Sequence, residues 1–110
     1  MTLPNGDRAV VEVVKLTGYC LNPDHPRGRH KARVFAAALG LTTDHADVLR
    51  DALLAAARTG EAVADEADEY GQRYSLDVIM EGPAGRARVR SAWIVRTGED
   101  FPRLTSCYVV

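Results

Sequence analysis

The hydrophobic period of this sequence changes once, from helical before Gly71 to strand-like after it. In the first part, apolar residues recur at spacings of three and four, most clearly at Val48, Leu49, Ala52, Leu53 and Ala56. In the second part the period is two, as at Tyr74, Leu76, Val78 and Met80. Helices followed by strands predict an α+β fold, in which N-terminal helices pack on one face of a three- to four-stranded antiparallel sheet.

Two helices are predicted in the first part. One begins at Arg29, directly after the loop Asn22–Gly28, whose two prolines and glycine forbid a continuous helix. It ends at Gly40, because glycine readily takes the left-handed conformation found at helix C-termini. The second helix starts in the N-cap region Thr42–Asp44 and ends at Gly60.

Two segments have no clear period. Ala9–Val14 predicts a brief extended piece followed by a turn of helix within Val13–Leu21, although such short apolar runs fit a strand or a helical turn equally. The acidic segment from Gly60 to Gly71 predicts a long surface loop or an irregular helical turn.

The strand-like part begins with a hairpin. Gly82–Gly85 turns the chain, and Arg86–Arg96 returns it as the partner of the preceding strand. One face of the returning strand carries Ala87, Val89, Ser91, Trp93 and Val95. Trp93 is therefore expected in the core, and the opposite face carries Arg86, Arg88 and Arg90.

A further strand, Arg103–Val110, follows a turn at residues 98–102. Regular alternation would place Arg103, Thr105 and Cys107 on one face and Tyr108 on the other.

Length and composition fit one domain spanning residues 1–110. With 110 residues, 46% of them hydrophobic, one ordinary core can form without metals or disulfides. No apolar run reaches the roughly 20 residues that span a bilayer, and Met1–Asp7 lacks the features of a signal peptide. We expect a cytoplasmic protein without a membrane partner, in which Cys20 and Cys107 are reduced thiols.

Charge is separated along the chain. The net charge of -1 excludes a globally basic nucleic-acid binder. Nevertheless, residues 24–33 hold one acid against Arg27, Arg29, Lys31 and Arg33. Residues 61–69 hold five acids and no base, and Arg86–Arg96 is basic again. This asymmetry permits local anion binding on a nearly neutral protein.

His25 and His30 are the first candidates for chemistry, because histidine exchanges protons near neutral pH. Next to Lys31 and the donor end of a helix, they would suit a phosphate group. The alternative reading is that both are surface or capping residues. The arginines of the returning strand have a similar alternative, since alternate arginines often only keep an open sheet face soluble.

No metal or other cofactor is expected. Suitable ligand types occur at Asp24, His25, His30 and His45, but the recognisable zinc spacings are absent and the cationic neighbours would repel a divalent ion. The sequence also lacks a phosphate-cradling glycine loop, a nucleophile elbow and a catalytic cysteine context.

The stretch Lys15–Phe35, with Asp68–Gly71, Ser91–Arg96 and Leu104–Tyr108, resembles an uncharacterised bacterial domain family of about this length. Members of that family occur as small stand-alone proteins and at the C-termini of larger polymorphic toxins. The resemblance covers nearly the whole chain, but the family is a domain of unknown function and implies no verified activity.

The layout shows a looser resemblance to the metal-independent ribonuclease toxins that include barnase, EndoU, the colicin nucleases and the RelE toxins. Two helices precede an antiparallel sheet that ends in a Thr-x-x-Tyr strand, and His and Lys lie at the first helix. Those enzymes cut RNA by attack of the 2′-hydroxyl on the adjacent phosphate. A likeness of layout and residue types is an analogy, and it implies roles only as expectations.

By that resemblance, His25 or His30 would be the general base or acid, and Lys31 would stabilise the charge of the transition state. Thr105 completes the expected catalytic set. The expected substrate-binding residues are Arg27, Arg29, Arg88, Arg90 and Tyr108.

The leading functional hypothesis is a toxin endoribonuclease that acts on tRNA or ribosome-associated RNA and is neutralised by a cognate antitoxin or immunity protein. The alternative is a non-catalytic binding module, such as an antitoxin, immunity or adaptor protein, whose basic surface holds an acidic partner. The first hypothesis requires that a histidine, Lys31 and at least one of Arg88, Arg90 or Thr105 meet in one place.

Overall fold

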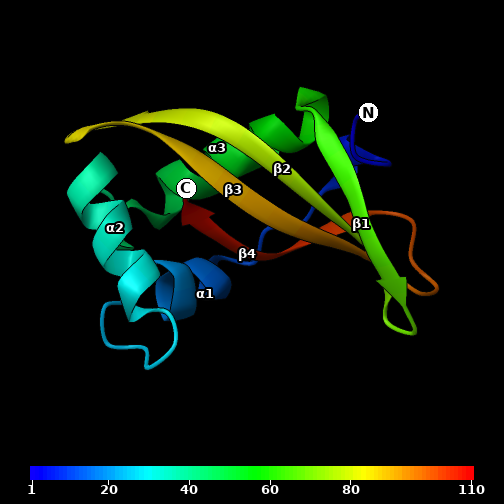
Figure 1. Cartoon of the computed structure of the whole chain (residues 1–110), viewed down its shortest axis with the longest axis horizontal. Helices are drawn as coiled ribbons and strands as arrows, with labels where there is room; N and C mark the ends of the chain where they lie inside the picture. The colour runs from blue at the N-terminus through cyan, green and yellow to red at the C-terminus, as the bar shows by residue number, and fades with distance from the viewer.

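The computed structural model describes the whole chain, Met1–Val110, and confirms the α+β fold (Figure 1). The helices precede the strands along the chain. They are α1 (Val13–Lys15), α2 (Arg29–Leu39) and α3 (Ala46–Thr59), with 3₁₀ turns at Gly6–Arg8 and Thr43–His45 and a π-helical segment at Leu16–Cys20. The strands are β1 (Ala62–Asp68), β2 (Gly71–Gly82), β3 (Gly85–Arg96) and β4 (Pro102–Val109).

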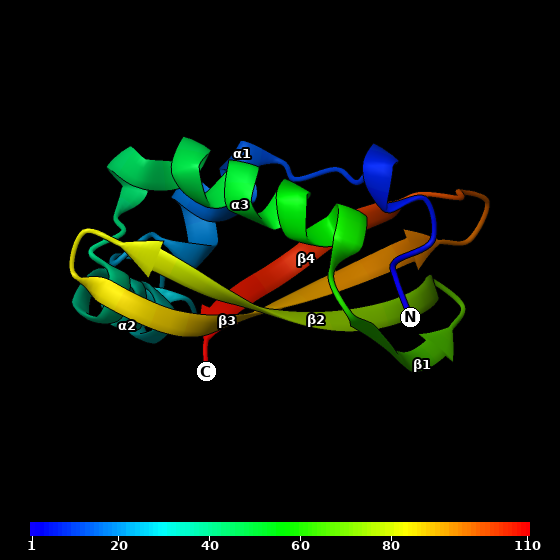
Figure 2. The same ribbon diagram turned by 90° about the horizontal axis from the view of Figure 1, so that it is seen from above.

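The four strands form one antiparallel sheet in the order β1-β2-β3-β4. Figure 2 shows α1 and α3 on one face of this sheet. Helix α2 lies at the end of the sheet, beneath the β2–β3 hairpin and beside the C-terminal end of β4 (Figure 1). The hairpin is docked on α2 through backbone, since Ala84 N donates to Leu39 O and a Cβ on Gly82 would collide with that same carbonyl.

The expected N-terminal elements are confirmed. Val10 is extended and bridges to Arg103 in parallel, before α1 and the π-helical segment form a short helical stretch. Helix α2 begins at Arg29, as expected, and its C-cap Gly40 takes a φ of 70°. Thr42 and His45 form a capping box ahead of α3.

The prediction of a loop or helical turn for Gly60 to Gly71 is wrong, because most of this segment is strand β1. Only Ala62 of β1 is buried. The rest of the strand extends beyond the helical layer and has no buried face. Apolar residues are therefore not needed at alternate positions, and the sequence shows no period of two there. A bulge between Ala64 and Ala67 further interrupts the alternation.

The predicted face of β4 is also wrong. The pairing with β3 shifts from Ala92↔Ser106 to Trp93↔Leu104, which leaves Thr105 as an extra residue. A bulge of this kind reverses the alternation of side chains beyond it. Cys107 therefore faces the helices and is fully buried, whereas Thr105 does not share its face.

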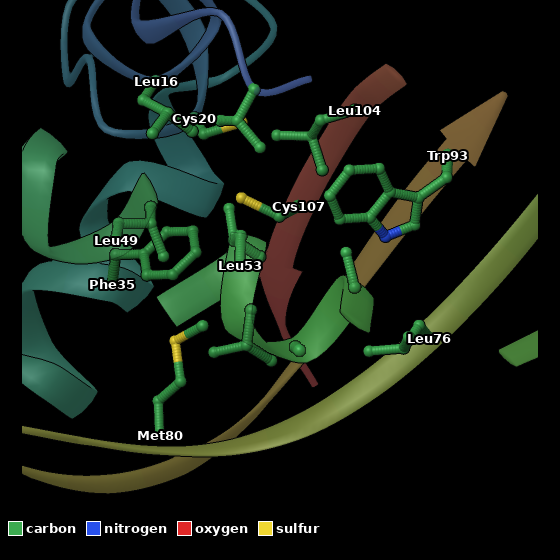
Figure 3. Packing of buried hydrophobic residues seen from close by; sticks show 14 of the residues in the cluster. Leu16, Cys20, Phe35, Leu49, Leu53, Leu76, Met80, Trp93, Leu104 and Cys107 are labelled. Carbon is green, nitrogen blue, oxygen red and sulfur yellow. The ribbon is translucent and has the colours of Figure 1, made fainter. Parts of the chain in front are cut away.

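The core lies between the sheet and the helices (Figure 3) and contains Trp93, as predicted. Trp93 is 1% exposed, and its Nε1 donates to Ser91 Oγ at 2.8 Å. Ser91 Oγ in turn donates to Leu76 O at 2.8 Å, so both buried polar side chains of this pair of hydrogen bonds have partners. Cys20 and Cys107 are buried free thiols in the same core. None of the helices is long and apolar enough to cross a membrane.

Candidate functional site

The site is built around Lys31, in the first turn of α2. Its Nζ lies 3.3 Å from the Tyr19 hydroxyl, 5.3 Å from the centroid of the Tyr19 ring and 5.1 Å from that of Tyr108. Tyr19 belongs to the π-helical segment and Tyr108 to β4, so three separate elements position one ammonium group. We call Tyr19, Lys31 and Tyr108 the lysine cage.

Lys31 forms no ion pair with a carboxylate, although eight ion pairs occur elsewhere in the chain. The Tyr108 ring attracts the cation by about 0.5–2 kcal/mol, and the Tyr19 hydroxyl accepts a hydrogen bond from it, without either group neutralising its charge. The Lys31 side chain is half-buried, so it has already lost much of its rotamer freedom on folding. Binding of a ligand would therefore order it little further. A held, unneutralised ammonium is suited to binding an anion.

Arg90 adjoins the cage, because it lies opposite Tyr108 in the β3–β4 register. Its guanidinium makes a bidentate ion pair with Asp77, with Nε–Oδ1 and Nη2–Oδ2 distances of 2.8 and 3.0 Å. Hydrogen bonding to Asp77, and secondly to the Tyr108 hydroxyl, raises the pKa of Arg90. The same bonds from Arg90 lower the pKa of Asp77. Much of the Arg90 charge is therefore balanced by Asp77.

His25 adjoins the opposite side of the cage. Its ring meets Tyr19 edge to face, with centroids 4.8 Å apart. Its Nδ1 accepts hydrogen bonds from the backbone N–H groups of Arg27 and Gly28, both at 3.0 Å. Nδ1 must be unprotonated to accept them, so the neutral ring carries its proton on Nε2. This arrangement favours His25 as a hydrogen-bond donor over His25 as a general base.

The other predicted residues fall into two groups. His30, Arg27, Arg29 and Arg88 are exposed, and none of the three arginines forms an ion pair. Thr105 lies apart, because its hydroxyl donates to Ala92 O and it lines a hollow with Asp65 and Glu66. Arg73 also lines the hollow, but it is paired with Asp68, so the two carboxylates leave an excess of negative charge that opposes the approach of a phosphate.

Two residues of the site were missed by the sequence reasoning. Tyr19 reaches Lys31 only because the loop between them folds back, and no spacing rule connects residues 19 and 31. Asp77 could have been found from the sequence, because it alternates with apolar residues on the strand that pairs with the one carrying Arg86, Arg88 and Arg90. A carboxylate on that face is a natural cross-strand partner for an arginine.

A pair of thiols lies behind the cage, since Cys20 follows Tyr19 and Cys107 precedes Tyr108. A hydrogen bond from Cys107 is the main cause that lowers the pKa of Cys20 to about 7, and the charge of Lys31 acts in the same direction. The pKa of Cys107 is raised by that hydrogen bond and by burial. The two thiols are fully buried and form no disulfide.

The sheet separates the charges that the sequence placed in different segments. The acidic strand β1 is one edge of the sheet, whereas the basic first turn of α2 lies beside β4 at the other edge (Figure 1). The resulting field attracts anions toward the lysine cage and repels them from β1.

On the hypothesis that the basic side of the sheet binds RNA, Asp77→Asn is expected to tighten that binding by roughly two- to fivefold at low salt, because it removes the charge that balances Arg90. Fluorescence anisotropy with a labelled single-stranded RNA would measure this change. Glu81→Gln is the matched control, since Glu81 is an exposed acid on the same strand without an ion pair. Equal tightening by both variants would contradict a specific role for Arg90.

The fold and the site together define a small α+β domain with a caged lysine on the basic side of its sheet. Residues 2–110 match the family described as a domain of unknown function (DUF6883), and the chain belongs to this family. The expected membership of an uncharacterised domain family is thereby confirmed. No curated protein matches the sequence.

Proposed function

We propose that the chain binds RNA at the lysine cage and cleaves it without a metal ion, by attack of a 2′-hydroxyl on the neighbouring phosphate. The single observation that carries the proposal is the Lys31 ammonium, held between two tyrosines and lacking a carboxylate partner. A phosphate that accepts a hydrogen bond from Lys31 would gain charge in the transition state, where a preorganised cation is most effective.

Residues around the cage support a longer nucleic-acid ligand. Arg27 and Arg29 are exposed on the loop before α2 and in its first turn, and Arg88 is the next residue to Arg90 on the outer face of β3. Unpaired arginines beside a phosphate site can hold the phosphates on either side of it. Tyrosine rings offer surfaces on which bases stack without regard to sequence.

Proton transfer is assigned to His30 and to the groups that adjoin Lys31. His30 is exposed in the first turn of α2, and we propose it as the group that accepts the proton of the 2′-hydroxyl. Because consecutive helical residues point roughly 100° apart, the RNA would have to follow the surface of this first turn to reach both His30 and Lys31. A tyrosine hydroxyl of the cage would then give a proton to the leaving oxygen. His25 Nε2–H would only donate a hydrogen bond, because loss of its proton would leave an imidazolate while Nδ1 still accepts from the backbone. Thr105 has no part in this scheme, because it lines the acidic hollow.

A cytoplasmic ribonuclease that acts on tRNA or ribosome-associated RNA would harm the cell that makes it. We therefore propose that the protein works as a toxin with a cognate antitoxin or immunity protein. An acidic surface on that partner, placed over the basic first turn of α2, would exclude RNA by charge.

Incubation of the purified protein with total bacterial RNA in EDTA tests the proposal. Cleavage is expected, and the products should carry 2′,3′-cyclic phosphate ends, because the 2′-hydroxyl is the nucleophile. Expression in a bacterial host is expected to arrest growth. Intact RNA at high protein concentration, together with normal growth of the expressing host, would contradict the cleavage proposal.

The second candidate function is a non-catalytic binding module with an acidic partner. It is favoured by His25, whose Nδ1 is already occupied by two backbone donors. Binding of RNA or of an acidic protein without cleavage, lost on substitution of Lys31, would select this function over the enzyme.

A further inference from the structure

His25 has the hydrogen bonds of a helix-capping residue. Its Nδ1 accepts from the backbone N–H groups of Arg27 and Gly28, both at 3.0 Å, and its carbonyl accepts from Arg29 N at 2.9 Å. A capping side chain binds the N–H groups two or three residues further on, and the carbonyl of the same residue accepts the first helical bond. Pro26 follows directly, at the position where a capped turn favours proline. His25 therefore caps the turn that leads into α2.

This turn brings Lys31 to its place in the lysine cage. Gly28 is packed against Tyr19, since a Cβ on Gly28 would lie 2.5 Å from the Tyr19 carbonyl oxygen. Ala32 N donates to Gly28 O at 3.0 Å, so the first turn of α2 starts from the same residue. The His25 ring itself meets the Tyr19 ring edge to face. The capped turn and Tyr19 thus form one packed unit, and this unit fixes Lys31 Nζ at 3.3 Å from the Tyr19 hydroxyl.

The cap exists only while Nδ1 of His25 carries no proton. Protonation of an imidazole turns both ring nitrogens into donors. A proton on Nδ1 would then face the N–H groups of Arg27 and Gly28, and neither of these groups has another acceptor in the backbone. Both hydrogen bonds would be lost together. A histidine ordinarily changes its charge between about pH 5 and 8, so this loss falls within an accessible range of pH.

The surroundings of His25 offer no replacement for the cap. The titratable side chains of its own segment are all exposed, and they are Asp24, Arg27, Arg29 and His30. From the π-helical segment His25 meets Tyr19, whose hydroxyl is bonded to the Lys31 ammonium. None of the ion pairs of the chain includes His25. Protonation would therefore break the cap without placing the charged ring in an ion pair.

We propose that His25 is a positioning residue for Lys31 and makes the lysine cage sensitive to pH. In its neutral form the ring caps the turn before α2 and holds Lys31 against Tyr19. Protonation releases the turn, so Lys31 loses its fixed position. A fixed cation stabilises developing negative charge better than a mobile one, because it needs no reorganisation during the reaction. Control of RNA cleavage by this device rests on the proposed function, whereas the coupling of His25 to the cage does not.

The direction of the effect separates this device from a simple effect of charge. A protonated His25 adds a positive charge to a basic segment, and added charge alone would strengthen the attraction of RNA phosphates at low pH. Release of the cap acts in the opposite direction on Lys31, because the ammonium is no longer held in one place.

Nuclear magnetic resonance of the purified protein tests the coupling without RNA. At about pH 7.5 the His25 ring should carry its proton on Nε2, and the Arg27 and Gly28 amides should be protected from hydrogen exchange. At about pH 5 the protection factors of both amides are expected to fall by about tenfold, the effect of losing one hydrogen bond each. The contact between the side chains of Lys31 and Tyr19 should weaken in the same titration.

His25→Asn is the discriminating variant. Asparagine is a favoured capping residue, and its side-chain oxygen accepts the same hydrogen bonds without titrating. The contact of Lys31 with Tyr19 should therefore be present at about pH 7.5 and remain at about pH 5. His25→Ala has no acceptor, so it should show a weakened contact at both values. His30→Ala is the matched control, because His30 is exposed in the same segment, and it should keep the response of wild type.

Cleavage of a labelled RNA extends the test to the proposed function. Protonation of His30 would also slow cleavage, so the quantity compared is the ratio of the His25→Asn rate to the wild-type rate. This ratio is expected to rise by about fivefold or more between about pH 7.5 and 5.5. An unchanged ratio would overturn the control of cleavage by His25. Absence of cleavage at every pH would contradict the proposed function alone, because the coupling is measured without RNA.

Three results of the magnetic resonance experiment would overturn the proposal itself. They are a neutral His25 ring with its proton on Nδ1, a ring that stays neutral at about pH 5, and a Lys31–Tyr19 contact that persists when His25 is protonated.

Discussion

Lys31→Met is expected to lower the rate of the proposed RNA cleavage by roughly 100- to 1,000-fold, the cost of removing one preorganised group that stabilises transition-state charge. Methionine keeps most of the apolar stem that packs between Tyr19 and Tyr108, so the fold should be retained. The rate is measured with a short labelled RNA in EDTA, under single-turnover conditions that separate cleavage from product release.

The chain offers a close control for this substitution. Lys15 is the only other lysine, and it is also partly buried, but it lies on α1 outside the cage. Lys15→Met removes the same charge and should leave the rate within about threefold of wild type. A Lys31→Met protein that is folded by circular dichroism and cuts RNA at the wild-type rate would contradict the role given to the cage.

Lys31→Arg separates position from charge. Arginine keeps the cation and stacks well on aromatic rings, but its planar group is larger than an ammonium and its donors point in fixed directions. If the cage only supplies charge, Lys31→Arg should retain both RNA binding and the cleavage rate, unlike Lys31→Met. If Lys31 must also place one donor on the phosphate, binding returns while the cleavage rate does not.

The parts of the fold that were predicted correctly are those with strong local signals. The α3 stripe, Gly40 after α2 and the Gly82–Gly85 turn each act over a few residues, and all three are where the sequence analysis expected them. Strand β1 was missed because a strand is recognised by apolar residues alternating on a buried face, and only Ala62 of β1 is buried. The Thr105 bulge was missed because an extra residue in a strand leaves no mark in composition.

The site could be predicted only in part for a related reason. The start of α2 at Arg29 is indicated by neighbouring residues alone, so Lys31 was correctly predicted to lie in the first turn of a helix. The contact of Lys31 with Tyr19 and Tyr108 joins three elements through the path of a loop and the register of two strands. Thr105 was assigned to the same cleft by regular alternation, and one bulge was sufficient to separate it from the cage.

Trp93→Ala is expected to lower the free energy of unfolding by about 3–5 kcal/mol, the usual cost of truncating a large buried aromatic residue. Trp93 is 1% exposed and packs in the cluster that joins β2, β3 and β4 to the helices (Figure 3). Domains of this size are stable by about 5–15 kcal/mol, so the variant should be only marginally folded. Urea unfolding followed by far-ultraviolet circular dichroism measures the loss.

Two further variants separate the packing of Trp93 from its hydrogen bond. Trp93→Phe keeps a ring but removes the Nε1 donor to Ser91 Oγ, and should cost about 1–3 kcal/mol. Ser91→Ala removes the acceptor of that bond and the donor to Leu76 O, and should cost about as much. Because both variants break the same Trp93–Ser91 bond, the double variant should cost less than the sum of the two. Strict additivity of their costs would show that the two side chains are not coupled.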